Sequence, residues 1–508
     1  MKVVHLCTEV VPGGAANSAL NLHEGLLSLG VESWILTGKL QGEVKNCILV
    51  SVEGGTADRE KELAQELIWS QRTEKSNSHF SLDYAWGNLA EHPLLQEADI
   101  LNFHWVSGLL DSNSSAALAG LGKPVVWTLH DMRPLTGGCH FSAGCLRFQE
   151  ECGECPQVQF DSLNFTRRSI QAMAEALALL KPHFVAPSRW MIQNALTSSV
   201  SRNLTSSCIP YGVDTEIFRP ASSTEARKKL GLERDVDYIL LASHSLLEKR
   251  KGAEYAIRIL EMFGSDPSTK ERIAAGQIRL LCCGKTAEEF LPEGWHVERT
   301  GYVPPQEMAS VYQAATLMLF TSTEDNLPNV ILEAMACGLP VVGHAVGGAK
   351  DLLDGERGGE RLFAPSEPGH GASLLALLLR GDECRREHGE SLAEKIRSGY
   401  TLQHQAERYR SLYRELLASP MMPCAAATPI NGGDDFLEHA CVVISQRREN
   451  DRLLNTVDSL CSRIQALEEE IAFLREIQQA YGIIIDSKWV RLGGKFGLCK
   501  PGEERFRR

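Results

Sequence analysis

The sequence predicts an α/β protein with two doubly wound, Rossmann-like domains and a helical coiled coil near its C-terminus. In both halves of the chain, short apolar runs typical of buried strands alternate with glycine-containing loops and amphipathic helical stretches. Beyond the second half, apolar residues recur at alternating spacings of four and three. The length of 508 residues leaves room for two or three domains.

The composition argues against several classes of protein. Hydrophobic residues make up 43% and charged residues 23% of the chain, as in ordinary globular proteins. The formal net charge of −13 argues against a general nucleic-acid binder. The N-terminus lacks the pattern of a signal peptide, and no run reaches the ~18 apolar residues of a membrane span. Most of the 15 cysteines stand singly in apolar runs, so we expect buried, reduced thiols in a cytoplasmic protein.

The first half, residues 1–205, is predicted to be a Rossmann-like domain. It opens with a strand near Val3–Cys7, a Gly13-Gly14 loop and a helix that Gly30 ends, which is how a doubly wound sheet begins. One Gly-Gly pair fits a phosphate-binding loop or a plain tight turn. Because the GxGxxG spacing is absent, we do not expect NAD.

Two later strands of this half end in residues that could face a ligand. The apolar run Lys123–Leu129 ends at His130-Asp131, and a neighbouring strand ends at His104-Trp105, which could line the same site. Ligands bind at the carboxyl ends of parallel strands. A histidine at such an end could also be a core residue whose nitrogens are satisfied by neighbours.

The second half, residues 206–417, repeats the alternation of strands and helices. Its first strand is followed by Lys249, Arg250 and Lys251, directly before a helix. Three cations at a helix N-terminus oppose the helix dipole, and a bound anion would relieve this conflict. A solvated charged turn is the alternative.

The most informative stretch is Thr321–Gly348, TSTEDNLPNVILEAMACGLPVVGHAVGG. An apolar strand runs into an acidic loop and then into a short, apolar helix that ends at Gly338. The helix N-terminus carries Asp325 and Asn326, and its backbone amides suit an anion. Glu333 lies about a turn and a half inside, as either a buried hydrogen-bond anchor or a ligand for vicinal hydroxyls.

This stretch closely resembles the donor-site signature of family 4 retaining glycosyltransferases, which have the GT-B fold. The signature has two Glu with seven residues between them, then an Ala-Met-Ala-Cys-Gly-x-Pro-Val-Val run, here Ala334–Val342. Glu333 takes the second position, and Asp325 stands where the first Glu is expected. The resemblance covers about residues 1–417. It implies two domains facing a cleft, with a last helix, about Leu402–Leu416, crossing back to the first.

The resemblance also implies an activity and roles for individual residues. A sugar would pass from a nucleotide diphosphate sugar to a saccharide or glycolipid acceptor, with retained configuration, in surface-polysaccharide or glycolipid assembly. His130 and Asp325 would face the donor sugar, Lys251 the diphosphate and Glu333 the ribose. Further donor contacts are expected at Gly13, Gly14, Arg250, Asn326 and Leu327.

Two features bear on whether the chain is catalytic. The Arg that family members carry about six residues before the Lys is missing here, near His244-Ser245, so Arg250 would have to replace it. No divalent catalytic metal is expected, because Lys and backbone amides take its place. A non-catalytic assembly subunit with this fold is the alternative, while a glycoside phosphorylase lacks an evident cofactor-lysine pattern.

A cysteine-rich insertion follows the His-Asp strand end, at residues 137–156. Its four cysteines have the spacing C-x5-C-x6-C-x2-C, and the closing pair is typical of a metal-binding turn. They are Cys139, Cys145, Cys152 and Cys155. We predict one structural zinc ion, with His140 as a substitute ligand; two disulfides or four unrelated thiols are the alternatives. The segment resembles a Cys-bearing insertion in one branch of family 4.

The C-terminal part is predicted to comprise a linker at 418–435, a coiled coil at 436–480 and a basic, aromatic tail at 481–508. β-branched residues at a and Leu at d favour a parallel homodimer, although a single helix packed on the catalytic domain is the alternative. The heptad residues are Leu453, Val457, Leu460, Ile464, Leu467, Ile471 and Leu474. The tail resembles those of some bacterial surface-polysaccharide transferases and could lie at the inner face of the membrane, or be a disordered terminus.

Overall fold

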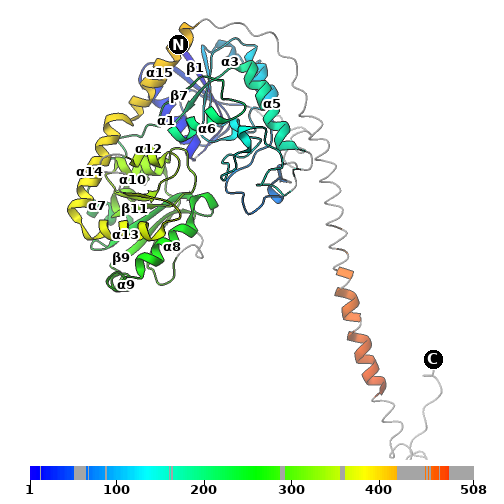
Figure 1. The fold of residues 1–508 in the computed structure, drawn as a ribbon, viewed down its shortest axis with the longest axis vertical. Coiled ribbons are helices and arrows are strands. Elements are labelled where there is room, and N and C mark those ends of the chain that lie inside the picture. The colour runs from blue at the N-terminus through cyan, green and yellow to red at the C-terminus, as the bar shows by residue number, and fades with distance from the viewer. Residues whose placement is uncertain are drawn as a thin grey trace, which may run out of the picture. The chain divides into compact units, whose positions relative to one another are not determined.

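The protein, seen here in a computed structural model, contains two parallel β-sheets with helices packed against them (Figure 1). The chain divides into two compact units, Met1–Leu437 and Glu438–Arg508, and both sheets belong to the first unit. The structure describes residues 1–11, 13–50, 65–66, 68–85, 89–159, 161, 164–285, 292–354, 361–419 and parts of 452–479.

The first sheet has seven parallel strands in the order β3-β2-β1-β4-β5-β6-β7. Its strands are β1 Lys2–Val10, β2 Glu32–Leu40, β3 Cys47–Leu49, β4 Ile100–Phe103, β5 Val125–Thr128, β6 His183–Ala186 and β7 Ser206–Cys208. The strand order reverses between β1 and β4, which is where a doubly wound sheet forms a crevice. Because β7 belongs to this sheet, the first half extends past residue 205, where it was predicted to end.

Helices and short 3₁₀ turns follow these strands. They are α1 Gly14–Ser28, α3 Pro93–Glu97, α4 Ser112–Ala119, η1 Arg133–Leu135, η2 Arg147–Gln149, α5 Phe165–Leu180 and α6 Arg189–Thr197. One side of the sheet packs in a core that includes Leu6, Phe103 and Trp127, all at most 2% exposed.

The second sheet has six parallel strands in the order β10-β9-β8-β11-β12-β13. They are β8 Asp237–Ser245, β9 Ile278–Lys285, β10 Val297–Gly301, β11 Leu317–Phe320, β12 Val341–His344 and β13 Leu362–Phe363. Its helices are α7 Ser223–Leu230, η3 Lys249–Lys251, α8 Ala253–Gly264, α9 Pro267–Ala274, α10 Pro305–Ala314, α11 Asn329–Ala336, α12 Ala349–Leu353, α13 Pro368–Arg380 and α14 Asp382–Gly399. The order reverses between β8 and β11, so the loops that follow these two strands border the crevice of this sheet.

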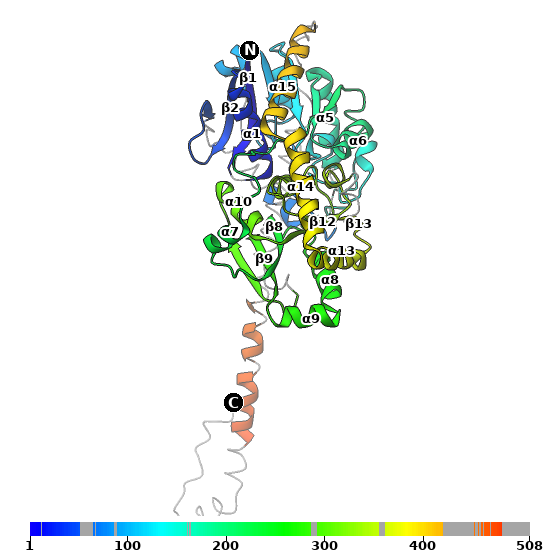
Figure 2. The same ribbon diagram turned by 90° about the vertical axis from the view of Figure 1, so that its left-hand side faces the viewer.

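The last helix of the first unit, α15 (Leu402–Ala418), returns to the first half and packs beside α1 (Figure 2). The hydroxyl of Tyr413 accepts a hydrogen bond from Asn102 Nδ2 at 2.8 Å, in a fully buried position. Gly25 permits the close approach, since a Cβ there would lie 2.9 Å from that of Ala406. The predicted crossing back to the first half is therefore confirmed.

The second unit is described only in part. Residues 462–467 and 469–479 are helical, and their apolar heptad residues are about half exposed. Predictions for 420–435, 436–451, Leu453, Val457 and the 481–508 tail lie outside the described residues. Among the helices that the structure describes, none is both long and apolar enough to cross a membrane.

A charged and histidine-rich cleft as the candidate active site

A cleft of about 580 Å³ lies at the carboxyl ends of the strands, with residues of both halves in its walls. This volume falls within the usual range for a small-molecule site. The cleft contains every donor-site residue that the sequence predicted: Gly13, Gly14, His130, Arg250, Lys251, Asp325, Asn326, Leu327 and Glu333. Residues more than 300 positions apart in the chain therefore meet in one space.

The second-half wall carries a cluster of fixed charges. Asp325 Oδ2 lies 2.7 Å from Lys251 Nζ and 3.2 Å from Arg250 Nη1. Burial alone would raise the pKa of Asp325, but Lys251 and Arg250 outweigh it and lower that pKa. Burial, helped by Arg250, lowers the pKa of Lys251, while Asp325 opposes this. Two cations on one carboxylate leave one surplus positive charge, which Glu248, 3.1 Å from Arg250, balances, so an anion would compete with these carboxylates for the cations.

Glycines hold this charged wall in place. Gly252 has a left-handed φ of 71°, and a Cβ there would lie 1.9 Å from the Thr321 carbonyl oxygen. Only glycine fits, so the Lys251-Gly252 pair brings the cation against the acidic loop. Gly347, at φ 49°, similarly packs on the Asp325 carbonyl, where a Cβ would come within 1.7 Å. Gly348 donates its amide to that same carbonyl at 3.2 Å.

Neighbouring acids in this loop face different partners. The Glu324 carboxylate accepts hydrogen bonds from Asn77 Nδ2 at 2.8 Å and from the Ala143 amide at 2.9 Å, both in the first half. Asp325 instead meets the two cations of the cleft. Glu324 thus joins the two halves, and Asp325 is the acid available to a ligand.

Glu333, on α11, faces the cleft from inside the second half. It accepts a hydrogen bond from the Tyr312 hydroxyl at 2.7 Å. Burial raises the pKa of Glu333 to about 7, although the Tyr312 hydrogen bond opposes the shift. The carboxylate is therefore poised to gain from hydroxyl donors, which stabilise its ionised form.

Asn326 lines the cleft, but its side chain is hydrogen-bonded within the protein. Its Nδ2 donates to the carbonyl oxygens of Leu129 and His130, at 2.8 and 3.0 Å, and its Oδ1 accepts from Ser188 Oγ at 2.8 Å. The side chain thus joins the His130 strand end to the loop that precedes α11. This leaves the backbone amide as the group of Asn326 that can meet a donor.

The first-half wall contains a buried chain of histidines. It runs from the Lys45 carbonyl through His23, Ser33, His5, His104 and His130 to Tyr211. Successive polar atoms lie 2.7–3.1 Å apart. Its members come from β1, β2, α1, the loops after β2, β4 and β5, and the connection after β7, so no single stretch of sequence contains it.

Chemistry fixes the direction of every bond in this chain. Burial lowers the pKa of His130 to about 4 and those of His5 and His104 well below the ordinary value, so the rings are neutral. The Lys45 carbonyl can only accept a hydrogen bond, so His23 Nε2, which contacts it, must donate. Each neutral ring then accepts on Nδ1 and donates from Nε2, and Tyr211 donates to His130 Nδ1 at 2.7 Å.

This arrangement limits what His130 can do. Its ring lines the cleft, as predicted, yet both ring nitrogens are already hydrogen-bonded, to His104 and to Tyr211. In this arrangement the imidazole shapes the wall and has no free nitrogen to act as a base. His5 and Tyr211 were missed by sequence reasoning; the polar His5 within a buried strand was the available signal.

A second polar group borders the cleft nearby. His140 Nδ1 lies 2.6 Å from Asp131 Oδ2, and its Nε2 lies 2.7 Å from Ser81 Oγ. Burial alone would raise the pKa of Asp131, but His140 and further hydrogen bonds lower it. His140, predicted as a substitute zinc ligand, has both nitrogens engaged here and lines the cleft. Trp105 lines the same wall.

Comparison with known structures identifies the fold. Sucrose-phosphate synthase from Thermosynechococcus elongatus aligns with a TM-score of 0.56 at 17% identity, over 83% of this chain and 100% of that one. HepE of Anabaena, in complex with UDP and glucose, aligns with a TM-score of 0.54 at 14% identity, over 82% and 100%. The chain has the GT-B fold. Residues 238–380 also match the family model described as glycosyl transferases group 1.

Curated proteins point the same way. The putative colanic acid biosynthesis glycosyl transferase WcaC of Escherichia coli K12 is 22% identical over 439 residues, which cover 82% of this chain and 100% of that protein. The D-inositol 3-phosphate glycosyltransferase of Corynebacterium aurimucosum is 27% identical, but the match spans only 53% of it and 43% of this chain. Together these findings support a glycosyltransferase.

Proposed function

We propose that the protein is a retaining glycosyltransferase that moves a sugar from a nucleotide diphosphate sugar to an acceptor hydroxyl. The observation that carries this proposal is the pairing of Lys251 and Arg250 with Asp325 in a cleft that also contains Glu333. Cations suit the diphosphate, and a carboxylate with a raised pKa suits the ribose hydroxyls.

The chemistry requires stabilisation of the departing diphosphate. Lys251, Arg250 and the backbone amides at the N-terminus of α11 offer positive charge to it, so we propose that no divalent metal is needed for this step. Arg250 would also take the place of the Arg that is missing upstream. The absence of that Arg was the argument for a non-catalytic assembly subunit. Water excluded by closure of the cleft could not compete with the acceptor.

Donor binding should rearrange the charges. Without donor, Lys251 Nζ is 2.7 Å from Asp325. A diphosphate would share this cation, which frees Asp325 oxygens for hydroxyls of the donor sugar. In this view Asp325, the shorter acid, neutralises Lys251 until the phosphates of the donor replace it. The neutral His130 ring would then pack against the sugar.

The neighbours suggest where to begin with substrates. HepE was solved with UDP and glucose, and the Escherichia coli relative is named for colanic acid biosynthesis. We therefore propose a UDP-sugar donor and a saccharide or glycolipid acceptor in surface-polysaccharide assembly. A screen of nucleotide sugars by thermal stabilisation and hydrolysis tests this, and NMR of the product anomer tests retention. No stabilisation by any nucleotide sugar would contradict the proposal.

We further propose that the protein forms a parallel homodimer through residues 453–474. The described heptad residues on this helix are 48–56% exposed: Leu460, Ile464, Leu467, Ile471 and Leu474. A second copy would bury them in a coiled-coil seam. Truncation after Ser419 should give a monomer that still binds nucleotide, as light scattering and calorimetry would show. An unchanged mass would remove the dimer proposal.

The 481–508 tail underlies a last proposal, that the protein works in the cytoplasm at the inner face of the membrane. Lys and Arg mixed with Trp and Phe in this tail suit an anionic lipid surface. Full-length protein should float with vesicles containing anionic lipid, and protein lacking residues 481–508 should not. Equal flotation of both would contradict the assignment to the tail.

A further inference from the structure

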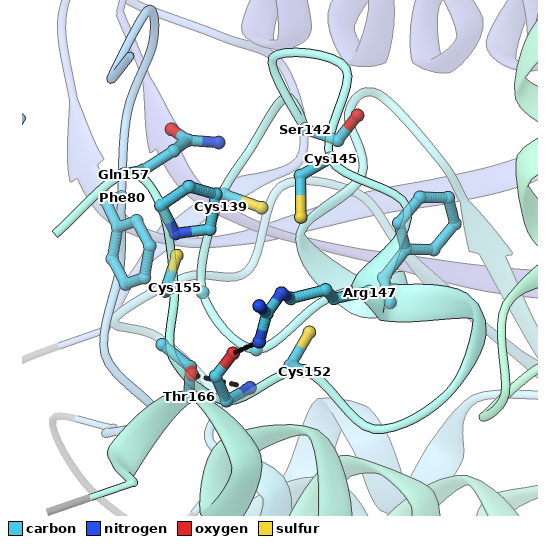
Figure 3. A pocket seen from close by; sticks show the side chains of 14 residues that line it. Phe80, Cys139, Ser142, Cys145, Arg147, Cys152, Cys155, Gln157 and Thr166 are labelled. Atoms are coloured by element: carbon cyan, nitrogen blue, oxygen red, sulfur yellow. Dashed lines mark hydrogen bonds between the residues drawn. The ribbon is translucent and has the colours of Figure 1, made fainter. Parts of the chain in front are cut away.

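The four clustered cysteines surround one small cavity, separate from the cleft. The lining of this cavity includes Cys139, Cys145, Cys152 and Cys155, and Figure 3 shows their sulfur atoms gathered around it. The cavity measures about 20 Å³, which is room for about one water-sized particle. All four thiols are free in the structure. The four cysteines, which span seventeen positions of sequence, thus surround a cavity that could hold one metal ion.

The loop that carries these cysteines is strained at two turns. Cys152 and Glu154 flank Gly153, and all three have left-handed φ values, of 52°, 43° and 90° respectively. Ala143, at φ 51°, lies before Cys145. Non-glycine residues pay about 1–2 kcal/mol each for this conformation. A loop persists in such a shape when something else holds it there.

Two arginines border the cysteines, and one has an unused donor. Arg147 lines the cavity and donates to the Gly153 carbonyl at 3.0 Å. The guanidinium of Arg167 packs against Gly153, where a Cβ would lie 3.2 Å from its Nε. That Nε is buried and has no hydrogen-bond partner among the described residues. Each arginine also pairs with a carboxylate of this segment, Arg147 with Glu154 and Arg167 with Glu151, both at 3.2 Å.

We propose that Cys139, Cys145, Cys152 and Cys155 bind one structural zinc ion. Four thiols would each release a proton to solvent and coordinate Zn²⁺ as thiolates in a tetrahedral, closed site. Four thiolates and one Zn²⁺ leave two net negative charges, and Arg147 and Arg167, which also pair with Glu154 and Glu151, are the cations next to them. No group of three or more potential ligands in the described residues already stands in metal-binding geometry. The ion would therefore draw the sulfurs inward across the small cavity.

The same loop contacts the donor wall of the cleft. Phe141 lies beneath the guanidinium of Arg250, 4.5 Å from it, and the Ala143 amide donates to Glu324 at 2.9 Å. Gln157, two residues after Cys155, holds the Phe141 carbonyl with its Nε2 at 2.8 Å. A metal that fixes the cysteine turns would therefore fix the support under Arg250. This second step rests on the proposed function of the cleft, whereas metal binding does not.

Metal analysis of the full-length protein tests the site. Protein purified without chelator should contain about one zinc per chain, and the Cys152→Ser/Cys155→Ser double variant should lose it. Cys208→Ser and Cys384→Ser, at isolated cysteines, should keep it. Cobalt-substituted protein should show thiolate-to-metal charge-transfer bands. Zinc-free wild-type protein with four freely reactive thiols would overturn the proposal, and so would two disulfides found by mass spectrometry of unreduced peptides.

Reversible chelation of the wild-type protein covers the case in which the variants fail to fold. Removal of zinc should lower the melting temperature and weaken UDP binding several-fold, and added zinc should restore both. If the melting temperature falls while UDP affinity stays constant, the metal site stands and its link to Arg250 is overturned. If zinc is present but no nucleotide binds either form, the function proposed for the cleft has failed and the metal site has not.

Discussion

The two walls of the cleft solve different problems with different chemistry. The second-half wall is charged, with Lys251 and Arg250 sharing Asp325. Around His130 the first-half wall is neutral, because His104 and His130 are locked into one tautomer by a chain of hydrogen bonds, although the ionised Asp131 is the next residue. Positioned charges can stabilise the negative charge that develops on a leaving diphosphate. Neutral, fully bonded rings give a rigid surface, so we expect the first wall to govern stability and the second to govern rate.

The largest effect should come from the charged wall. Lys251→Ala removes the cation nearest Asp325, and we expect a barrier higher by about 2–4 kcal/mol, measured as kcat with the best donor. Lys249→Ala is the matched control, because Lys249 is exposed and its Nζ contacts the Glu74 carbonyl at 3.1 Å. An equal loss of kcat in both variants would show that any nearby positive charge matters, and not Lys251 in particular.

The second largest effect should be a loss of stability at acidic pH, caused by the neutral histidines of the first-half wall. Burial lowers the pKa of His130 to about 4, whereas the unfolded chain protonates near 6.5. Between these values the unfolded state binds protons that the folded state refuses, so stability falls as pH drops from about 6.5 toward 4. His130 alone accounts for a loss on the order of 3 kcal/mol, and His5 and His104 add to it. Urea unfolding across this range should show the decline, and His130→Gln should make its slope shallower. An unchanged slope would argue against a buried neutral ring.

The contact between the walls should give a smaller effect. Asn326→Ala removes bonds to Leu129, His130 and Ser188, and leaves buried carbonyls unpaired. We expect about 1–3 kcal/mol lower unfolding free energy by denaturant titration. Asn329→Ala should cost less, since its 3.2 Å bonds to Gly14 and Ser18 lie nearer the surface. The reverse order would contradict the role given to Asn326.

The smallest effect concerns pH and donor affinity. The pKa of Glu333 is about 7, so nucleotide affinity should rise with pH up to about 7 and then level off. Below that point the change should approach tenfold per pH unit, or about 1.4 kcal/mol, by calorimetry. Glu333→Gln should abolish the dependence. Tyr312→Phe removes the hydrogen bond that lowers the pKa of Glu333, so the midpoint of the affinity change should move to higher pH. An unchanged midpoint would show that Tyr312 does not affect the titration of Glu333.

The charged wall was largely predictable from the sequence. Asp325, the α11 N-terminus and Glu333 occupy one continuous stretch, and Lys251-Gly252 is a local turn. Their placement depends on short-range geometry, namely a strand end, a helix start and a glycine that alone fits a left-handed turn. The same locality made two first-half strands predictable: those expected at Val3–Cys7 and Lys123–Leu129 are β1 Lys2–Val10 and β5 Val125–Thr128.

The neutral wall was decided only by the tertiary structure. His5 and His104 stand 99 positions apart, and Asn326 meets the His130 carbonyl across 196 positions. Sheet order and helix packing set these distances, and neither leaves a mark at any single position of the chain. The tertiary structure also showed that Glu324 faces the first half while Asp325 faces the cleft. The sequence by itself determined which groups were available, and long-range packing determined which of them meet, because a hydrogen bond requires its partners within about 3 Å.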